Sequence, residues 1–149
     1  MIDVKNFEQG DQEVKELNSL TECVIGAAIE VHRQLGPGLL ESVYEACLYS
    51  ELRLLGAEVQ RQIVLPISYK GVVLEEGMRM DLLVGRSLIV ELKAVEALLP
   101  IHSAQVITYL KLSKLSGGLL LNFNVTALRQ GIKRLYASKA YKGIPPLTP

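Results

Sequence analysis

The fold is decided by the stretch from Gly77 to Val95, which reads Gly-Met-Arg-Met-Asp-Leu-Leu-Val-Gly-Arg-Ser-Leu-Ile-Val-Glu-Leu-Lys-Ala-Val. This pattern predicts two apolar strands joined by a turn at residues 85–87. Burying a charged side chain costs several kcal/mol unless it has a partner or a metal. The strands nevertheless carry three ionisable side chains, Asp81, Glu91 and Lys93.

The length of the turn decides whether the two carboxylates share a face. A two-residue turn would leave Asp81 on the face opposite Glu91, because side chains alternate along a strand. A three-residue turn pairs Val84 with Leu88 and places Asp81 directly across from Glu91. We therefore predict an odd-numbered turn, or a bulge with the same effect.

Two carboxylates and a lysine on one face suit a hard divalent cation such as Mg²⁺, with the ammonium group orienting a water molecule. The motif Glu91-Leu92-Lys93 is weak evidence alone, since Asp3-Val-Lys5 and Glu13-Val-Lys15 have the same spacing. Its context differs, because the apolar run Leu88-Ile-Val90 precedes it directly. The alternative is an edge strand whose Glu and Lys are solvated.

Length and composition predict one domain, since 149 residues can bury a core without disulfides. The hydrophobic fraction of 49% indicates either a full core or a surface that meets another subunit. The sequence starts without an apolar leader, and no apolar run approaches the length of a membrane span. We expect a cytoplasmic protein with no membrane association. Cys23 and Cys47 fall in apolar helical patterns and are predicted to be core residues without chemistry.

Charge is unevenly distributed along the chain. Residues 1–96 hold nine basic and sixteen acidic side chains, whereas residues 97–149 hold seven basic and no acidic ones. These cations either bind a polyanion such as nucleic acid or neutralise the acidic part of the protein, within the fold or across a dimer. The seven are Lys111, Lys114, Arg129, Lys133, Arg134, Lys139 and Lys142.

Before the central stretch, the pattern predicts two helices. Residues 1–17 are polar and are expected to form a mobile arm or a weak helix. A capping-box pattern at residues 19–22 predicts the start of a helix of about 15 residues, which Gly36-Pro-Gly38 ends. A second helix is predicted from Leu39 to Leu55, with Glu41 in its first turn.

Around the central stretch, the period predicts further strands and one helix. Residues 58–75 favour strands, with Pro66 at an edge or bulge and a tight turn at Lys70-Gly71. A helix is predicted from Ile101 to Ser116, a strand at residues 119–125 and another strand over residues 129–137. The predicted domain spans residues 18–140, and residues 141–149 form a proline-rich tail.

The predicted helix at residues 101–116 carries one polar ridge among apolar neighbours. Its members, His102, Gln105 and Tyr109, stand at i, i+3 and i+7. A lone histidine at the start of a helix is usually a cap or a surface group, and the alternative for His102 is a catalytic base or metal ligand.

The sequence resembles the small "GxxExxY" proteins of the PD-(D/E)XK nuclease-like superfamily over about residues 18–137. Gly38-Leu-Leu-Glu41-Ser-Val-Tyr44 carries the Gly-x-x-Glu-x-x-Tyr signature. Asp81, Glu91-x-Lys93 and a Gln-x-x-x-Tyr element at residues 105–109 follow in the expected order. The resemblance implies an α+β fold with a restriction-endonuclease-like core, a mixed central sheet flanked by helices in the order αα-βββ-α-β-(β).

The resemblance also implies a metal-dependent nuclease site. Asp81 and Glu91 would bind Mg²⁺ or Mn²⁺, Glu41 would complete the shell directly or through water, and the Leu92 carbonyl would be a further ligand. Lys93 would orient the attacking water, and Gln105 and Tyr109 would hold the substrate phosphate or the lysine. Met80 stands where the family's nominal proline precedes Asp81.

Two hypotheses follow. The first is a metal-dependent phosphodiesterase acting on nucleic acid, with DNA expected and a homodimer plausible because one site cuts one strand. The second is a non-catalytic module on the same scaffold that binds nucleic acid or a protein partner. High apolar content and small size favour this second hypothesis.

Overall fold

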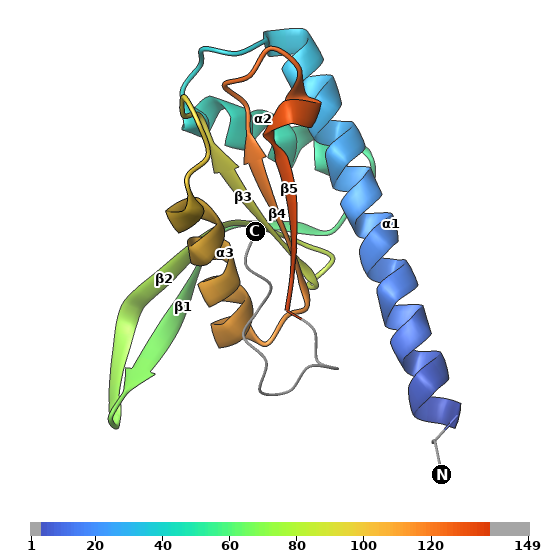
Figure 1. Cartoon of the computed structure of the whole chain (residues 1–149), viewed down its shortest axis with the longest axis vertical. Coiled ribbons are helices and arrows are strands. Elements are labelled where there is room, and N and C mark those ends of the chain that lie inside the picture. The colour runs from blue at the N-terminus through green and yellow to red at the C-terminus, as the bar shows by residue number, and fades with distance from the viewer. Residues whose placement is uncertain (1–3, 138–149) are drawn as a thin grey trace.

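The structure is a computed structural model that describes residues 4–137, with side chains from residue 10 onward (Figure 1). Its elements run in the order α1 (Val4–Leu35), α2 (Glu41–Leu54), β1 (Val59–Tyr69), β2 (Val72–Val84), β3 (Leu88–Lys93), α3 (Pro100–Ser113), β4 (Gly117–Asn122), the 3-10 helix η1 (Leu128–Gly131) and β5 (Ile132–Tyr136).

The five strands form one mixed sheet in the order β1-β2-β3-β4-β5. Neighbouring strands pair antiparallel except β3 and β4, which are parallel and are joined through α3. Only a crossover connection can join parallel neighbours, and α3 supplies it. This confirms the predicted α+β fold with a mixed central sheet.

Two apolar clusters lie on opposite faces of the sheet. The first packs α1 and α2 against one face, with Val24, Tyr44 and Leu48 among its buried residues. The second packs α3 against the other face, with Val106 and Leu110 at its centre. The flanking helices predicted from the family resemblance therefore cover both faces (Figure 1).

The turn between β2 and β3 has the predicted odd length. Val84 pairs with Leu88 across residues 85–87, and Leu82 pairs with Val90. Gly85 and Arg86 both have positive φ, 59° and 57°, which the tight turn requires. Continuing the register places Asp81 opposite Glu91, as predicted.

The β1–β2 hairpin also follows the prediction. Lys70 and Gly71 form its turn with φ of 48° and 82°, the left-handed pair that a two-residue hairpin turn favours. The register shifts between Leu65 and Ile67, on either side of Pro66. Proline cannot donate a ladder hydrogen bond, which explains the irregularity at this edge strand.

The first helix is longer than predicted. It begins at Val4, so the start at Ser19 was wrong, and residues 4–17 continue the helix instead of preceding it. Described side chains before Leu17 are exposed and polar apart from Val14. This part of α1 therefore gave no apolar period by which the sequence could reveal a helix.

At the carboxyl-terminal end, the strand predicted over residues 129–137 is confirmed for β5, and its first residues instead belong to η1. The proline-rich tail, 141–149, and residues 138–140 of the predicted domain lie outside the described residues. Among the helices described, none is both long and apolar enough to cross a membrane.

Candidate metal-dependent nuclease site

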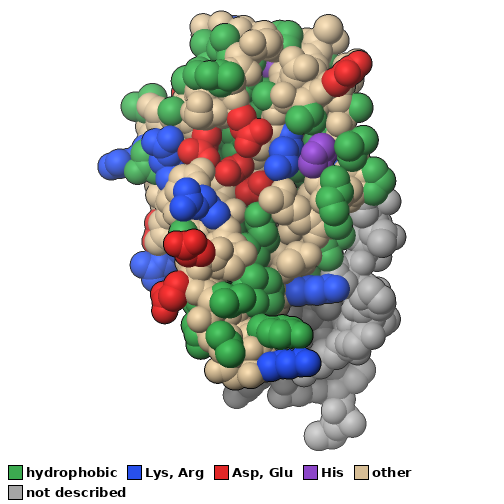
Figure 2. Space-filling model, turned by 90° about the vertical axis from the view of Figure 1, so that its left-hand side faces the viewer, with side chains coloured by type: hydrophobic (Ala, Val, Ile, Leu, Met, Phe, Trp, Pro, Cys, Tyr) green, Lys and Arg blue, Asp and Glu red, His purple; other side chains and the backbone are tan. Residues whose placement is uncertain are grey.

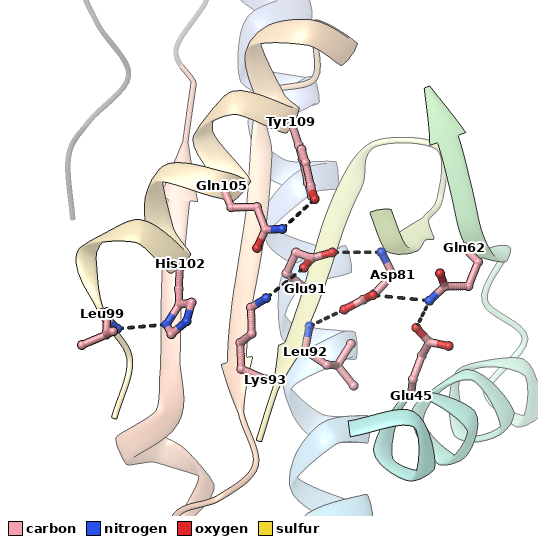
Figure 3. A network of polar contacts seen from close by, with 10 residues as sticks. All are labelled: Glu45, Gln62, Asp81, Glu91, Leu92, Lys93, Leu99, His102, Gln105 and Tyr109. Carbon is pink, nitrogen blue, oxygen red and sulfur yellow. Dashed lines mark hydrogen bonds and ion pairs between the residues drawn. The ribbon is translucent and has the colours of Figure 1, made fainter. Parts of the chain in front are cut away.

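Asp81 and Glu91 meet where the pairing of β2 with β3 ends. The last backbone pair between these two strands is Leu82 with Val90. Beyond it, backbone N–H groups donate to side-chain carboxylates instead of backbone carbonyls. The Asp81 N–H donates to Glu91 Oε1 at 2.9 Å, and the Leu92 N–H donates to Asp81 Oδ2 at 2.9 Å (Figure 3). Each strand thus receives a side-chain oxygen from the other, which fixes both carboxylates.

Lys93 completes the predicted trio on this face. Its Nζ lies 3.8 Å from Glu91 Oε2, and the two side chains are 16% and 4% exposed. The alternative of a solvated edge strand does not hold, because β3 lies in the middle of the sheet between β2 and β4. An acid and a lysine are therefore nearly buried together.

Glu41, in the first turn of α2, lies near enough to Asp81 and Lys93 for their charges to affect its pKa. Tyr44, one turn later, donates its hydroxyl to the Gly36 carbonyl at 2.6 Å and accepts the Leu39 N–H at 3.1 Å. These bonds hold the Gly-Pro-Gly turn against the helix start. The glutamate and the tyrosine of the Gly-x-x-Glu-x-x-Tyr motif consequently have separate tasks, since Tyr44 fixes the turn from which Glu41 projects.

Burial raises the pKa of each of these carboxyls, and neighbouring carboxylates add to the shifts. Burial, and then the charge of Asp81, raises the pKa of Glu91 to about 8. Burial is also the main cause of the raised pKa values of Asp81 and of Glu41, and the Asp81 charge adds to the effect on Glu41. Lys93 opposes all three shifts without cancelling them. Without a further cation, the site therefore favours the protonated form of Glu91 at neutral pH.

The polar ridge of α3 faces these carboxyls. Gln105 Nε2 donates to the Tyr109 hydroxyl at 2.8 Å, so the predicted Gln-x-x-x-Tyr element acts as one unit (Figure 3). Burial, and then the charge of Glu91, raises the pKa of Tyr109. His102 is a helix cap, since its Nδ1 accepts the Leu99 N–H at 3.0 Å.

The site includes two further residues, Glu45 and Gln62, which the sequence patterns did not reveal. Glu45 on α2 is 7% exposed, and its carboxylate accepts hydrogen bonds from Arg61 and Gln62 of β1. Gln62 Nε2 also lies 3.4 Å from Asp81 Oδ1. The sequence did contain one signal for Glu45, because the apolar helical stripe through Tyr44 and Leu48 places this residue beside the core.

The donor set fits the hard divalent cation that the family resemblance implies. Among the side chains described, those of residues 10–137, no three Asp, Glu, His or Cys residues form a ready-made metal-binding group. Glu41, Asp81 and Glu91 nevertheless influence one another electrostatically, and oxygen ligands with excess negative charge are what Mg²⁺ and Mn²⁺ select. The Leu92 N–H contacts Asp81, and a ligand role for the Leu92 carbonyl stays a prediction.

Figure 2 shows acidic side chains gathered in the middle of one face, with basic side chains around them. The basic residues of the last third that the structure describes belong to several elements. Lys111 and Lys114 lie at the end of α3, before β4, whereas Arg129 lies in η1, after β4. Lys133 and Arg134 lie on β5, and Lys139 and Lys142 lie outside the described residues.

The chain matches the family model described as the PD-(D/E)XK nuclease superfamily over residues 18–135. No curated protein matches the sequence. Among solved structures, the crystal structure of SSO0001 is similar, with 23% identity, a TM-score of 0.45 and coverage of 83% of this chain. The match spans 59% of that protein's chain. The finer assignment to the GxxExxY proteins stays a prediction. By the family match over most of its length, the chain belongs to the PD-(D/E)XK nuclease superfamily.

Proposed function

We propose that this protein is a divalent-cation-dependent phosphodiesterase that hydrolyses nucleic acid, with DNA as the expected substrate. The observation that carries the proposal is the reciprocal pair of Asp81 and Glu91, each accepting a backbone N–H from the opposite strand, with Lys93 beside them. Membership in a nuclease superfamily supports the same class of reaction.

The residues of the site divide the work of hydrolysis. Mg²⁺ or Mn²⁺, when bound, supplies positive charge that stabilises the developing phosphate charge and lowers the pKa of water. Asp81, Glu91 and Glu41 would hold that cation through their carboxylate oxygens. The Lys93 ammonium orients the attacking water and donates to a phosphate oxygen. Gln105 and Tyr109, joined by their hydrogen bond, hold the substrate phosphate from α3.

The proposed partner is a nucleic-acid backbone that follows α3 away from the site. Gln105 and Tyr109 are on this helix, and Lys111 lies farther along it, with Lys114 directly after its last residue. Replacing both lysines with alanine should weaken binding and reduce the salt dependence of the affinity, because fewer counterions are released. An unchanged salt slope, measured by fluorescence anisotropy of a labelled oligonucleotide, would argue against this path.

Cleavage assays test the activity directly. Purified protein is incubated with single- and double-stranded DNA and with RNA, in Mg²⁺, Mn²⁺ or chelator. Asp81→Ala and Lys93→Ala should abolish cation-dependent cleavage, while Lys70→Ala in the distant hairpin turn should retain it. Circular dichroism of each variant establishes that it is folded. Cleavage that persists in both folded site variants would exclude this site.

The same assay decides between catalysis and the binding-module alternative. A pure binding module would retain nucleic-acid binding without any cation-dependent cleavage and would not need Asp81 for Mn²⁺ affinity. The oligomeric state is measured by analytical ultracentrifugation of the protein with and without DNA. The proposed homodimer would provide a second active site for the second strand.

A further inference from the structure

Gln62 has a backbone conformation that is unusual for its position. Its φ is 50°, in the left-handed region, which costs a non-glycine residue about 1–2 kcal/mol. The other non-glycine residues with positive φ among those described are in turns or at a helix end: Lys70, Arg86 and Lys114. Gln62 instead lies within β1, between two regular pairs with β2. Strain of this kind is maintained only where the surrounding structure enforces it, and it concentrates at functional sites.

This conformation lets two consecutive side chains reach one carboxylate. In a regular strand, Arg61 and Gln62 would point to opposite faces. Here Arg61 Nη2 donates to Glu45 Oε2 at 3.1 Å, and Gln62 Nε2 donates to Glu45 Oε1. Glu45 can anchor both side chains, because it is on α2 and its position is restricted by burial, with 7% of the residue exposed.

The Gln62 amide joins this anchor to the predicted site. Its nitrogen also lies 3.4 Å from Asp81 Oδ1 (Figure 3). With carboxylate oxygens on two sides, the amide must present its NH₂ group, since its oxygen would be repelled by both. Asp81 is therefore contacted at both oxygens, by Gln62 at Oδ1 and by the Leu92 N–H at Oδ2.

A structural explanation of the strain also exists. The hairpin changes faces near this point, since Leu82 packs in the cluster beneath α2 whereas Met80 packs in the cluster beneath α3. The left-handed residue could serve this bend alone. A glycine at position 62 would keep the bend, because it adopts positive φ freely, and would remove only the amide.

We propose that Gln62 is a positioning residue, which holds the Asp81 carboxylate in place for a divalent cation while Glu45 anchors the amide. This inference rests on the proposed function, since it assumes that Asp81 is a metal ligand. The neutral amide also separates the carboxylates of Glu45 and Asp81, which would otherwise repel each other or share a proton.

Calorimetric titration with Mn²⁺ tests this role without an activity assay. Gln62→Gly should weaken Mn²⁺ binding by about tenfold, equal to about 1.4 kcal/mol. Gln62→Asn should weaken binding similarly, because asparagine tolerates positive φ but is one methylene too short to contact both carboxylates. The matched control is Lys70→Gly, which relieves a similar φ of 48° in a turn and should leave the affinity unchanged.

Unfolding in urea, run in parallel, separates positioning from folding. Gln62→Gly and Lys70→Gly should both retain cooperative unfolding, and only the first should lose Mn²⁺ affinity. Wild-type affinity in folded Gln62→Gly or Gln62→Asn overturns the inference and leaves the proposed function standing. Absence of Mn²⁺ binding to the wild-type protein overturns both. If Gln62→Gly fails to fold, Gln62→Asn decides the matter.

Discussion

Removing the charge of Glu91 should make the metal-free protein more stable at alkaline pH. The pKa of Glu91 is about 8, against 4.5 for a free glutamate. Between these values the folded protein keeps a proton that the unfolded chain has released, so stability is lost as pH rises. At about 1.4 kcal/mol per unit, the full shift corresponds to roughly 5 kcal/mol, most of which is lost between pH 4.5 and pH 8.

The assay is urea unfolding followed by circular dichroism, in chelator, from pH 5 to pH 9. The free energy of unfolding of the wild type should fall across this range. Glu91→Gln should flatten the profile and be the more stable protein above pH 8. The matched control is Gln105→Ala, which alters the site without removing a titrating group and should keep the wild-type slope.

A cation provides the second arm of this experiment. Saturating Mn²⁺ should stabilise the wild type more at pH 8 than at pH 5, because the cation competes with the proton on Glu91. Glu91→Gln should show little of this stabilisation. Parallel pH profiles for the wild type and Glu91→Gln in chelator would refute the argument that burial and the Asp81 charge hold this carboxyl protonated.

The remaining predictions concern the scaffold and are checked by the same urea unfolding. Tyr44→Phe removes a buried hydroxyl bonded at 2.6 Å to the Gly36 carbonyl and should cost about 1–3 kcal/mol, with Tm falling accordingly. Gly131→Ala should cost about 3 kcal/mol, because its Cβ would lie 2.1 Å from the Asn122 carbonyl oxygen. Its matched control, Gly10→Ala, meets nothing within 4 Å in an exposed part of α1 and should stabilise the protein by about 0.5–1 kcal/mol. Equal effects of the two glycine substitutions would contradict the packing argument.

The register of the central hairpin could be predicted because strand parity leaves few choices. Once the apolar runs on both sides of residues 85–87 are recognised, only an odd turn brings Asp81 opposite Glu91. The order of helices and strands followed similarly from changes in apolar period and from the glycines and prolines between them. Such features are encoded locally and need no knowledge of tertiary contacts.

The start of α1 could not be predicted in this way. The first half of this helix has no apolar stripe in its sequence, so the periodicity there could not show whether a helix forms. Leu17 first packs against the sheet, where it lies close to Gly117. The Ser19 capping pattern was misleading because this serine is within the helix and its N-terminal neighbours are helical too.

Sequence motifs indicated the acids, the lysine and the Gln-x-x-x-Tyr pair, but not the support around them. Glu45 and Gln62 come together only because Gln62 adopts a positive φ inside a strand. No residue pattern announces that conformation in a glutamine, which lacks the usual preference of glycine or asparagine. Support of this kind depends on tertiary packing, and only the structure revealed it.

The exchange of N–H groups between β2 and β3 gives the site its own spectroscopic reporters. Because the Asp81 and Leu92 amides donate to carboxylates instead of carbonyls, their nitrogen and proton chemical shifts depend on the charge those carboxylates carry. In a ¹⁵N-labelled sample, two backbone resonances would therefore follow protonation, and the diamagnetic Mg²⁺ ion could be titrated against the same two signals.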